Sequence, residues 1–142
     1  MSTLHVGYIK NNAITRCLEE RLRHKGLRNI RKTYVGASIY TSDNLTINGF
    51  NIENRCHKGI HAEEMAVLNC IQYGIDPKTV IGIIVSFSNQ DIKRLTFCCG
   101  HCRQVLWEYT QNPDVLCTEV DLDGNIIKEV KLGDLYPYPY PR

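Results

Sequence analysis

Hydrophobic and polar residues alternate along the chain with periods that change several times between helical and extended. In chain order they predict a helix over 13–25, strands over 34–40 and 45–50, a helix over 62–73, a strand over 79–87, a helix over 101–111, and strands over 115–120 and 126–131. The face that the first helix would bury consists of Ile14, Cys17, Leu18 and Leu22.

The segment 79–87 (TVIGIIVSF) is an almost unbroken run of apolar, mostly β-branched residues. A strand of this kind is buried on both faces, so helices must cover the sheet above and below. The order of elements then predicts a single domain over residues 1–142, with an α/β fold. We expect a three-layer α/β/α sandwich with a mixed sheet of about five strands.

Length, composition and cysteine content restrict the class of protein. The 142 residues, 43% of them hydrophobic and 23% charged, suit one globular domain and exclude a disordered chain. No apolar run approaches the ~20 residues of a membrane span, and residues 1–8 lack the pattern of an export signal. We therefore expect a cytoplasmic protein whose seven cysteines are reduced thiols.

The charge of the chain argues against a nucleic-acid-binding protein. Its formal net charge is only +2, whereas such proteins usually carry a strong basic patch. The most basic stretch, residues 21–32, suits either a phosphate contact or the solvated end of a helix.

Candidate chemistry is concentrated in two short motifs, H-A-E at 61–63 and C-G-H-C at 99–102. Each motif falls at the start of a predicted helix, where the positive end of the helix dipole favours thiolate over thiol. His61, Cys99 and Cys102 would supply three zinc ligands and leave the fourth tetrahedral position for water, which is typical of a catalytic zinc site.

Glu63 lies two residues after the predicted histidine ligand, where its carboxylate can take a proton from the zinc-bound water without replacing it. Zinc lowers the pKa of that water to about 7. The combination predicts hydrolytic deamination at an amidine carbon. Alone, the C-x-x-C motif would also suit a redox-active pair or half of a zinc ribbon, and H-x-E alone is expected by chance.

The remaining thiols suit structural roles. Cys98 and His101 form a C-x-x-H pair that competes with the predicted ligand set, since all four side chains around one metal would close its open position. The thiols expected to be small core or half-buried residues are Cys17, Cys56, Cys70 and Cys117.

These motifs resemble those of the cytidine deaminase family in its small, single-domain form. The likeness extends over about residues 30–140, and besides H-A-E it includes V-G-A at 35–37, N-I-E-N at 51–54 and C-G-H-C-R-Q-V-L at 99–106. It implies one zinc ion per chain and a pyrimidine nucleoside as substrate, with cytidine or 2'-deoxycytidine converted to the uridine compound plus ammonia.

The resemblance also implies roles for individual residues. Asn51 and Glu53 would hold a ribose hydroxyl, the backbone N–H of Ala62 would contact the pyrimidine carbonyl, and Glu63 would contact the ring nitrogen. Such enzymes are usually homotetramers in which neighbouring chains complete each pocket. The tail 136–142 (YPYPYPR), which we expect to be extended, is then either a loose terminus or a segment whose tyrosines dock on a neighbour.

Two departures from the family pattern concern the zinc site. Small members usually have C-A-E-R where this chain has H-A-E-E at 61–64. Three thiolates on zinc give a net charge of −1, which the arginine offsets, whereas one imidazole and two thiolates are neutral and make Glu64 tolerable. Cys98 replaces the usual proline and its fixed φ.

A third departure concerns the substrate. The family's aromatic residue before V-G-A should fall at Thr33, but the aromatic here is Tyr34, which in a strand would face the other side. Another aminopyrimidine therefore stays open as substrate, such as a blasticidin-type antibiotic, a modified cytidine or dCMP. The candidates for a phosphate contact are Lys58, Lys93 and Arg94. Nucleic-acid editing and a non-catalytic zinc protein are the remaining alternatives.

Overall fold

The computed structural model describes residues 3–25, 33–56, 58–87 and 98–141. Its elements in chain order are α1 (Thr3–Lys25), β1 (Val35–Thr41), β2 (Thr46–Phe50), β3 (Ile52–Glu53), β4 (Gly59–Ile60), α2 (Ala62–Gln72), a 3₁₀ turn η1 (Pro77–Thr79), β5 (Val80–Phe87), α3 (Gly100–Thr110), β6 (Leu116–Val120), β7 (Ile126–Lys131) and α4 (Leu132–Leu135).

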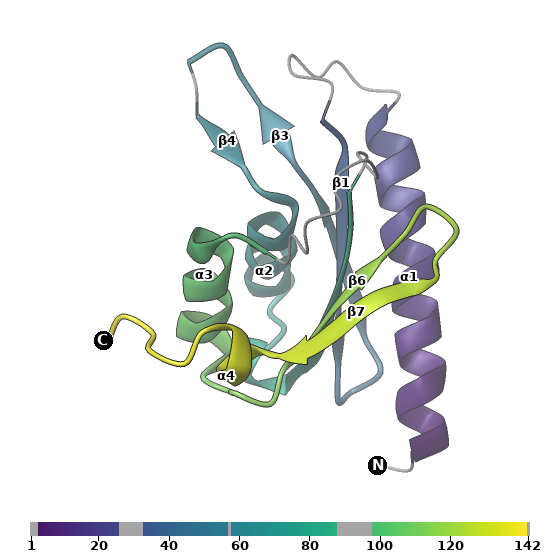
Figure 1. Cartoon of the computed structure of the whole chain (residues 1–142), viewed down its shortest axis with the longest axis vertical. Coiled ribbons are helices and arrows are strands. Elements are labelled where there is room, and N and C mark those ends of the chain that lie inside the picture. Colours follow the sequence, from purple (N-terminus) through teal and green to yellow (C-terminus); the bar gives the residue numbers. More distant parts are fainter. Residues whose placement is uncertain (1–2, 26–32, 57, 88–97, 142) are drawn as a thin grey trace.

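Five strands form one mixed sheet in the order β2-β1-β5-β6-β7. β5 and β6 pair in parallel, whereas β1 is antiparallel to β2 and β5, and β7 is antiparallel to β6. α1 covers one face of the sheet, and α2 and α3 cover the other (Figure 1). The three-layer α/β/α sandwich predicted from the sequence is therefore confirmed.

The central strand β5 contributes to a hydrophobic core on each face of the sheet. Ile83 packs in the core shared with α2 and α3, where it belongs to the same cluster as Val67 and Leu106. Ile84, its neighbour in the strand, points to the α1 side and joins the cluster that contains Ile9. Both isoleucines are fully buried, as expected for a strand covered on two sides.

Helix α1 is longer than predicted, but most of its predicted face does meet the core: Cys17 is buried, and Ile14 and Leu18 pack partly buried against the same cluster. The helix begins at Thr3, ten residues before the predicted start, and its buried stripe is Ile9, Ala13 and Cys17. Leu22, predicted to be buried, is 63% exposed. The stripe recurs every four residues and includes the small Ala13, so a pattern read only from large apolar side chains misses it.

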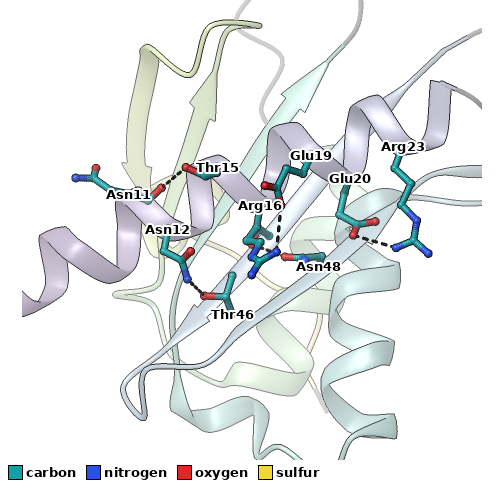
Figure 2. Close-up of polar contacts among 10 residues, drawn as sticks. Asn11, Asn12, Thr15, Arg16, Glu19, Glu20, Arg23, Thr46 and Asn48 are labelled. Atoms are coloured by element: carbon teal, nitrogen blue, oxygen red, sulfur yellow. Dashed lines mark hydrogen bonds and ion pairs between the residues drawn. The ribbon is translucent and has the colours of Figure 1, made fainter.

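Contacts of α1 with the edge of the sheet are shown in Figure 2. Asn12 Nδ2 donates to Thr46 Oγ1 on β2 at 3.2 Å. A Cβ at Gly36 would lie 2.3 Å from the carbonyl oxygen of Cys17, so the absence of a side chain there lets α1 pack directly on the backbone of β1. Among the described helices, α1 included, none is long and apolar enough to cross a membrane.

Four small elements of the described residues, β3, β4, η1 and α4, were not predicted. β3 and β4 form a separate antiparallel pair that projects beyond the start of α2 (Figure 1). α4 is a short helix after β7, anchored by the fully buried Leu132. Beyond it, residues 137–141 have no helix or strand, and residues 137–138 form a bend.

The tail lies along α3 of its own chain. Tyr136 donates its hydroxyl to Gln104 Oε1 at 2.7 Å, and the backbone N–H of Tyr140 donates to the same oxygen at 3.0 Å. Gln104 Nε2 donates to the carbonyl of Tyr140 at 3.2 Å. The tail is thus not loose, although the side chain of Tyr138 is 91% exposed.

Candidate active site

The starts of α2 and α3 meet on one side of the sheet and bring together the predicted zinc ligands. His61 is the N-cap residue of α2, and Cys99 is the N-cap residue of α3. His61 Nδ1 lies 3.2 Å from Cys99 Sγ and 3.3 Å from Cys102 Sγ. Within the described ranges, these residues form the one group of three His, Cys, Asp or Glu side chains whose ligand atoms all lie within 4.8 Å of one another.

The donor set fits zinc. Zn²⁺ in proteins is tetrahedral, with Zn–N bonds of about 2.0 Å and Zn–S bonds of about 2.3 Å, so adjacent ligand atoms are about 3.5–3.8 Å apart. The observed nitrogen–sulfur distances of 3.2 and 3.3 Å need to widen only slightly. His61, Cys99 and Cys102 would therefore hold the ion, with one coordination position left open.

Cys98 does not compete for the metal. It is 2% exposed and lies in the hydrophobic core, where its thiol hydrogen-bonds to Cys117. Its carbonyl accepts a 2.8 Å hydrogen bond from Arg103 Nε, which supports the turn where proline is usual. Cys17, Cys70 and Cys117 are buried as predicted, but the prediction for Cys56 was wrong, because this residue lies in the exposed turn between β3 and β4.

Glu63 lies beside the ligand group and is only 4% exposed. Burial raises its pKa above the ordinary value, while a hydrogen bond from the backbone, the charge of His61 and a hydrogen bond to Cys102 act in the opposite direction. A carboxylate with a raised pKa holds a proton more readily near neutral pH, which suits a group that takes up and releases protons.

Cys102, the second proposed thiol ligand, is also buried. Burial raises the pKa of Cys102, and the nearby Glu63 and Cys99 raise it further. A bound Zn²⁺ reverses this preference because it stabilises the thiolate, so metal binding at this site must release protons.

Two adjoining hollows, with volumes of about 170 and 630 Å³, open beside His61. Residues that line both are Ile52, Asn54, Lys58, Gly59, Ile60 and His61. Asn51 and Glu53 line the smaller hollow, whereas Glu64 and His101 line the larger one. The β3–β4 pair thus forms a wall of the cavity and carries Glu53 towards the zinc site.

Asn51 is 7% exposed and is held by the first residue of β1 and by Thr33, two residues before it. Its Oδ1 accepts from the backbone N–H of Val35, and its Nδ2 donates to the carbonyl of Thr33, both at 2.9 Å. One N–H and one lone pair of the amide remain for a ligand. Thr33 and Tyr34 lie before the first residue of β1. The expectation that Tyr34 faces the side opposite to Thr33 assumed that both belong to a strand, and it therefore does not apply.

Sequence reasoning missed the role of Glu64 as a partner of His101. The two side chains approach to 3.2 Å, and Glu64 also accepts a 3.4 Å hydrogen bond from the backbone N–H of His61. The hydrogen bond to His61 could have been predicted, because a glutamate at the third position of a helix is a capping signal. The contact with His101 could not.

A mixed α/β/α sandwich with His-Cys-Cys donors at two helix starts and a buried glutamate beside them defines the class of zinc-dependent deaminases. Residues 9–118 match the model of the cytidine and deoxycytidylate deaminase zinc-binding region. The chain belongs to this family.

Solved structures agree with this assignment. The cytidine deaminase from Burkholderia pseudomallei is 25% identical, with a TM-score of 0.78 over 91% of this chain and 97% of that one. The cytidine deaminase from Mycobacterium tuberculosis is 20% identical, with a TM-score of 0.72 over 94% and 98%. That from Bacillus anthracis is 18% identical, with a TM-score of 0.62 over 89% of each chain. The last two support the fold alone.

Proposed function

We propose that this protein is a zinc-dependent cytidine deaminase, which hydrolyses cytidine or 2'-deoxycytidine to uridine or 2'-deoxyuridine and ammonia. The observation that carries the proposal is the convergence of His61, Cys99 and Cys102 with the buried carboxylate of Glu63 beside them. When bound, zinc supplies Lewis-acid activation of water at neutral pH.

The chain's own residues move the protons. Glu63 takes a proton from the attacking water and delivers it to the ring nitrogen of the pyrimidine, and a second transfer protonates the amino group that leaves as ammonia. The inner side of the site is apolar, because Ala62 is fully buried, Glu63 and Cys102 are buried, and Cys98 packs in the core. This setting strengthens each charge interaction with the transition state.

Binding of the nucleoside uses the hollows beside the zinc ligands. Glu53 accepts a hydrogen bond from a ribose hydroxyl, and Asn51 uses the N–H that it does not donate to Thr33. The N–H of Ala62 in the first turn of α2 donates to the pyrimidine carbonyl, since the first N–H groups of a helix lack partners within it. We further propose a homo-oligomer, with a tetramer favoured, because both hollows are open to solvent in a single chain and a neighbouring chain would close them. We also propose a cytoplasmic location, in keeping with the free thiols.

A second candidate substrate is dCMP. Lys58 lines both hollows, next to the proposed ribose contacts, and its ammonium is suited to a phosphate. The other candidate cations, Lys93 and Arg94, lie outside the described residues. The carboxylates of Glu53 and Glu64 on the same walls favour an uncharged nucleoside over an anionic nucleotide.

The test is ammonia release from purified protein given cytidine, deoxycytidine, dCMP and a blasticidin-type antibiotic in parallel. We expect turnover of the two nucleosides. Glu63→Gln should retain zinc and fold but lower kcat by about 10²–10⁴-fold, with zinc measured by elemental analysis. Turnover of dCMP alone, or full activity of Glu63→Gln, would contradict the proposal.

A further inference from the structure

The starts of α2 and α3 are joined by one carboxylate oxygen as well as by the proposed zinc ligands. Glu64 Oε2 lies 3.2 Å from His101 Nε2 and accepts from the backbone N–H of His61 at 3.4 Å. Glu64 belongs to the first turn of α2, and His101 belongs to the first turn of α3. We refer to this contact as the Glu64–His101 bridge.

The rings of the two histidines reinforce the same junction. His61 and His101 meet edge to face, with centroids 5.8 Å apart and planes inclined at 72°. Edge-to-face pairs of aromatic rings attract one another because the positive edge of one faces the negative face of the other. The ring that carries the proposed ligand atom Nδ1 is thus oriented by a residue of the opposite helix.

Such a junction matters because the proposed zinc ligands come from chain segments 38 residues apart. Without further contacts, the metal itself would have to bring the two helix starts together, and part of its binding free energy would be lost in ordering them. A contact that joins the helices before zinc arrives lowers this loss.

We propose that Glu64 and His101 are positioning residues that hold the His61, Cys99 and Cys102 side chains ready for zinc. The inference rests on the zinc site proposed above. Since the side chains are 23% and 57% exposed, each contact is weak, and we expect about a three- to tenfold effect on zinc affinity.

The test measures zinc affinity of the full chain by competition with a chelator. Glu64→Ala and His101→Ala should each weaken binding by about three- to tenfold, and the double variant should lose less than the product of the two single losses, because both remove the same bridge. Glu64→Gln should bind nearly as wild type, since its amide oxygen still accepts from both donors. The matched control is Glu19→Ala, which removes the exposed ion pair with Arg16 on α1 and should change nothing.

Absorption of the cobalt-substituted protein supplies a second readout, because its visible bands report ligand geometry and not merely folding. The bands should shift in Glu64→Ala and return in Glu64→Gln. Additive losses, unchanged affinities, or equal losses in Glu64→Gln and Glu64→Ala would overturn the bridge. Tight zinc binding by the wild type with no deaminase activity would instead contradict the proposed function while the bridge still stood.

Discussion

Adding a single methyl group at Gly49 should disturb both the packing of α2 on the sheet and the zinc site at the start of that helix. Gly49 lies on β2 and faces the start of α2, where an added Cβ would be 2.3 Å from the carbonyl oxygen of Ala62 and 2.5 Å from the backbone nitrogen of Ala66. Both obstacles are backbone atoms, so no side-chain rotation relieves the overlap. In Gly49→Ala, α2 must move by about 1 Å to restore an ordinary contact near 3.4 Å.

The cost of this movement can be bounded from the packing. Overfilling a close-packed interior costs about 1–3 kcal/mol, and Ala62 and Ala66 are both fully buried, which places Gly49→Ala towards the upper end. For a domain of this size each kcal/mol lowers Tm by about 3–4 °C, so we expect a decrease of about 6–12 °C. Because His61 begins the same helix, kcat/KM should also fall by about 10²-fold.

Thermal unfolding followed by circular dichroism measures the first effect, and deamination assays measure the second. The matched control is Gly7→Ala, also a glycine-to-alanine change, at a helical position of α1 with no heavy atom within 4 Å of the added Cβ. It should raise the free energy of unfolding by about 0.5–1 kcal/mol. A Gly49→Ala protein within ~0.5 kcal/mol of wild type would refute the reasoning.

Three further predictions concern the tail, acid stability and the metal. Gln104→Leu removes the amide that bonds Tyr136 and Tyr140, so carboxypeptidase should trim the tail faster than in wild type; equal rates would contradict this role. Burial raises the pKa of Glu129, but hydrogen bonds from Lys10 and Thr118 and the charge of Lys10 outweigh it and hold the pKa below its ordinary value of 4.5. The stabilisation from Glu129 is therefore complete above pH 4.5 and lost as pH falls through the lower folded value, so the Tm advantage of wild type over Glu129→Gln should shrink on acidification, and a constant difference would contradict it. Removing zinc with a chelator should lower the free energy of unfolding by about 4 kcal/mol relative to protein with free zinc at a thousand times its Kd, and an unchanged Tm would contradict a site formed only in the folded chain.

Elements with a strong local pattern were predicted well. The run of β-branched residues in β5 and the turn between β6 and β7 gave strands within one residue of those observed. The N-terminal half of α1 was missed, because its buried positions there are Ile9 and the small Ala13. Their burial follows from where the sheet lies, which local periodicity does not report.

The candidate site likewise contains residues that a local pattern predicts and contacts that it does not. His61, Cys99 and Cys102 were predictable because ligand chemistry restricts both residue type and spacing. The bridge between Glu64 and His101 was not, since it joins two helices and depends on how their starts approach each other.

The sequence by itself determined the class of fold, the donor atoms for zinc and the carboxylate beside them. These follow from local periodicity and from the few residue types that bind zinc, and both are properties of short segments. Tertiary structure decided the rest. It buries Glu63 and so raises the pKa of its carboxyl group, and it places Cys98 in the hydrophobic core. It also brings Gln104 within hydrogen-bond distance of Tyr136 and Tyr140 in the tail. Each of these depends on the distance between segments far apart in the chain, and that distance is set only when the helices pack on the sheet.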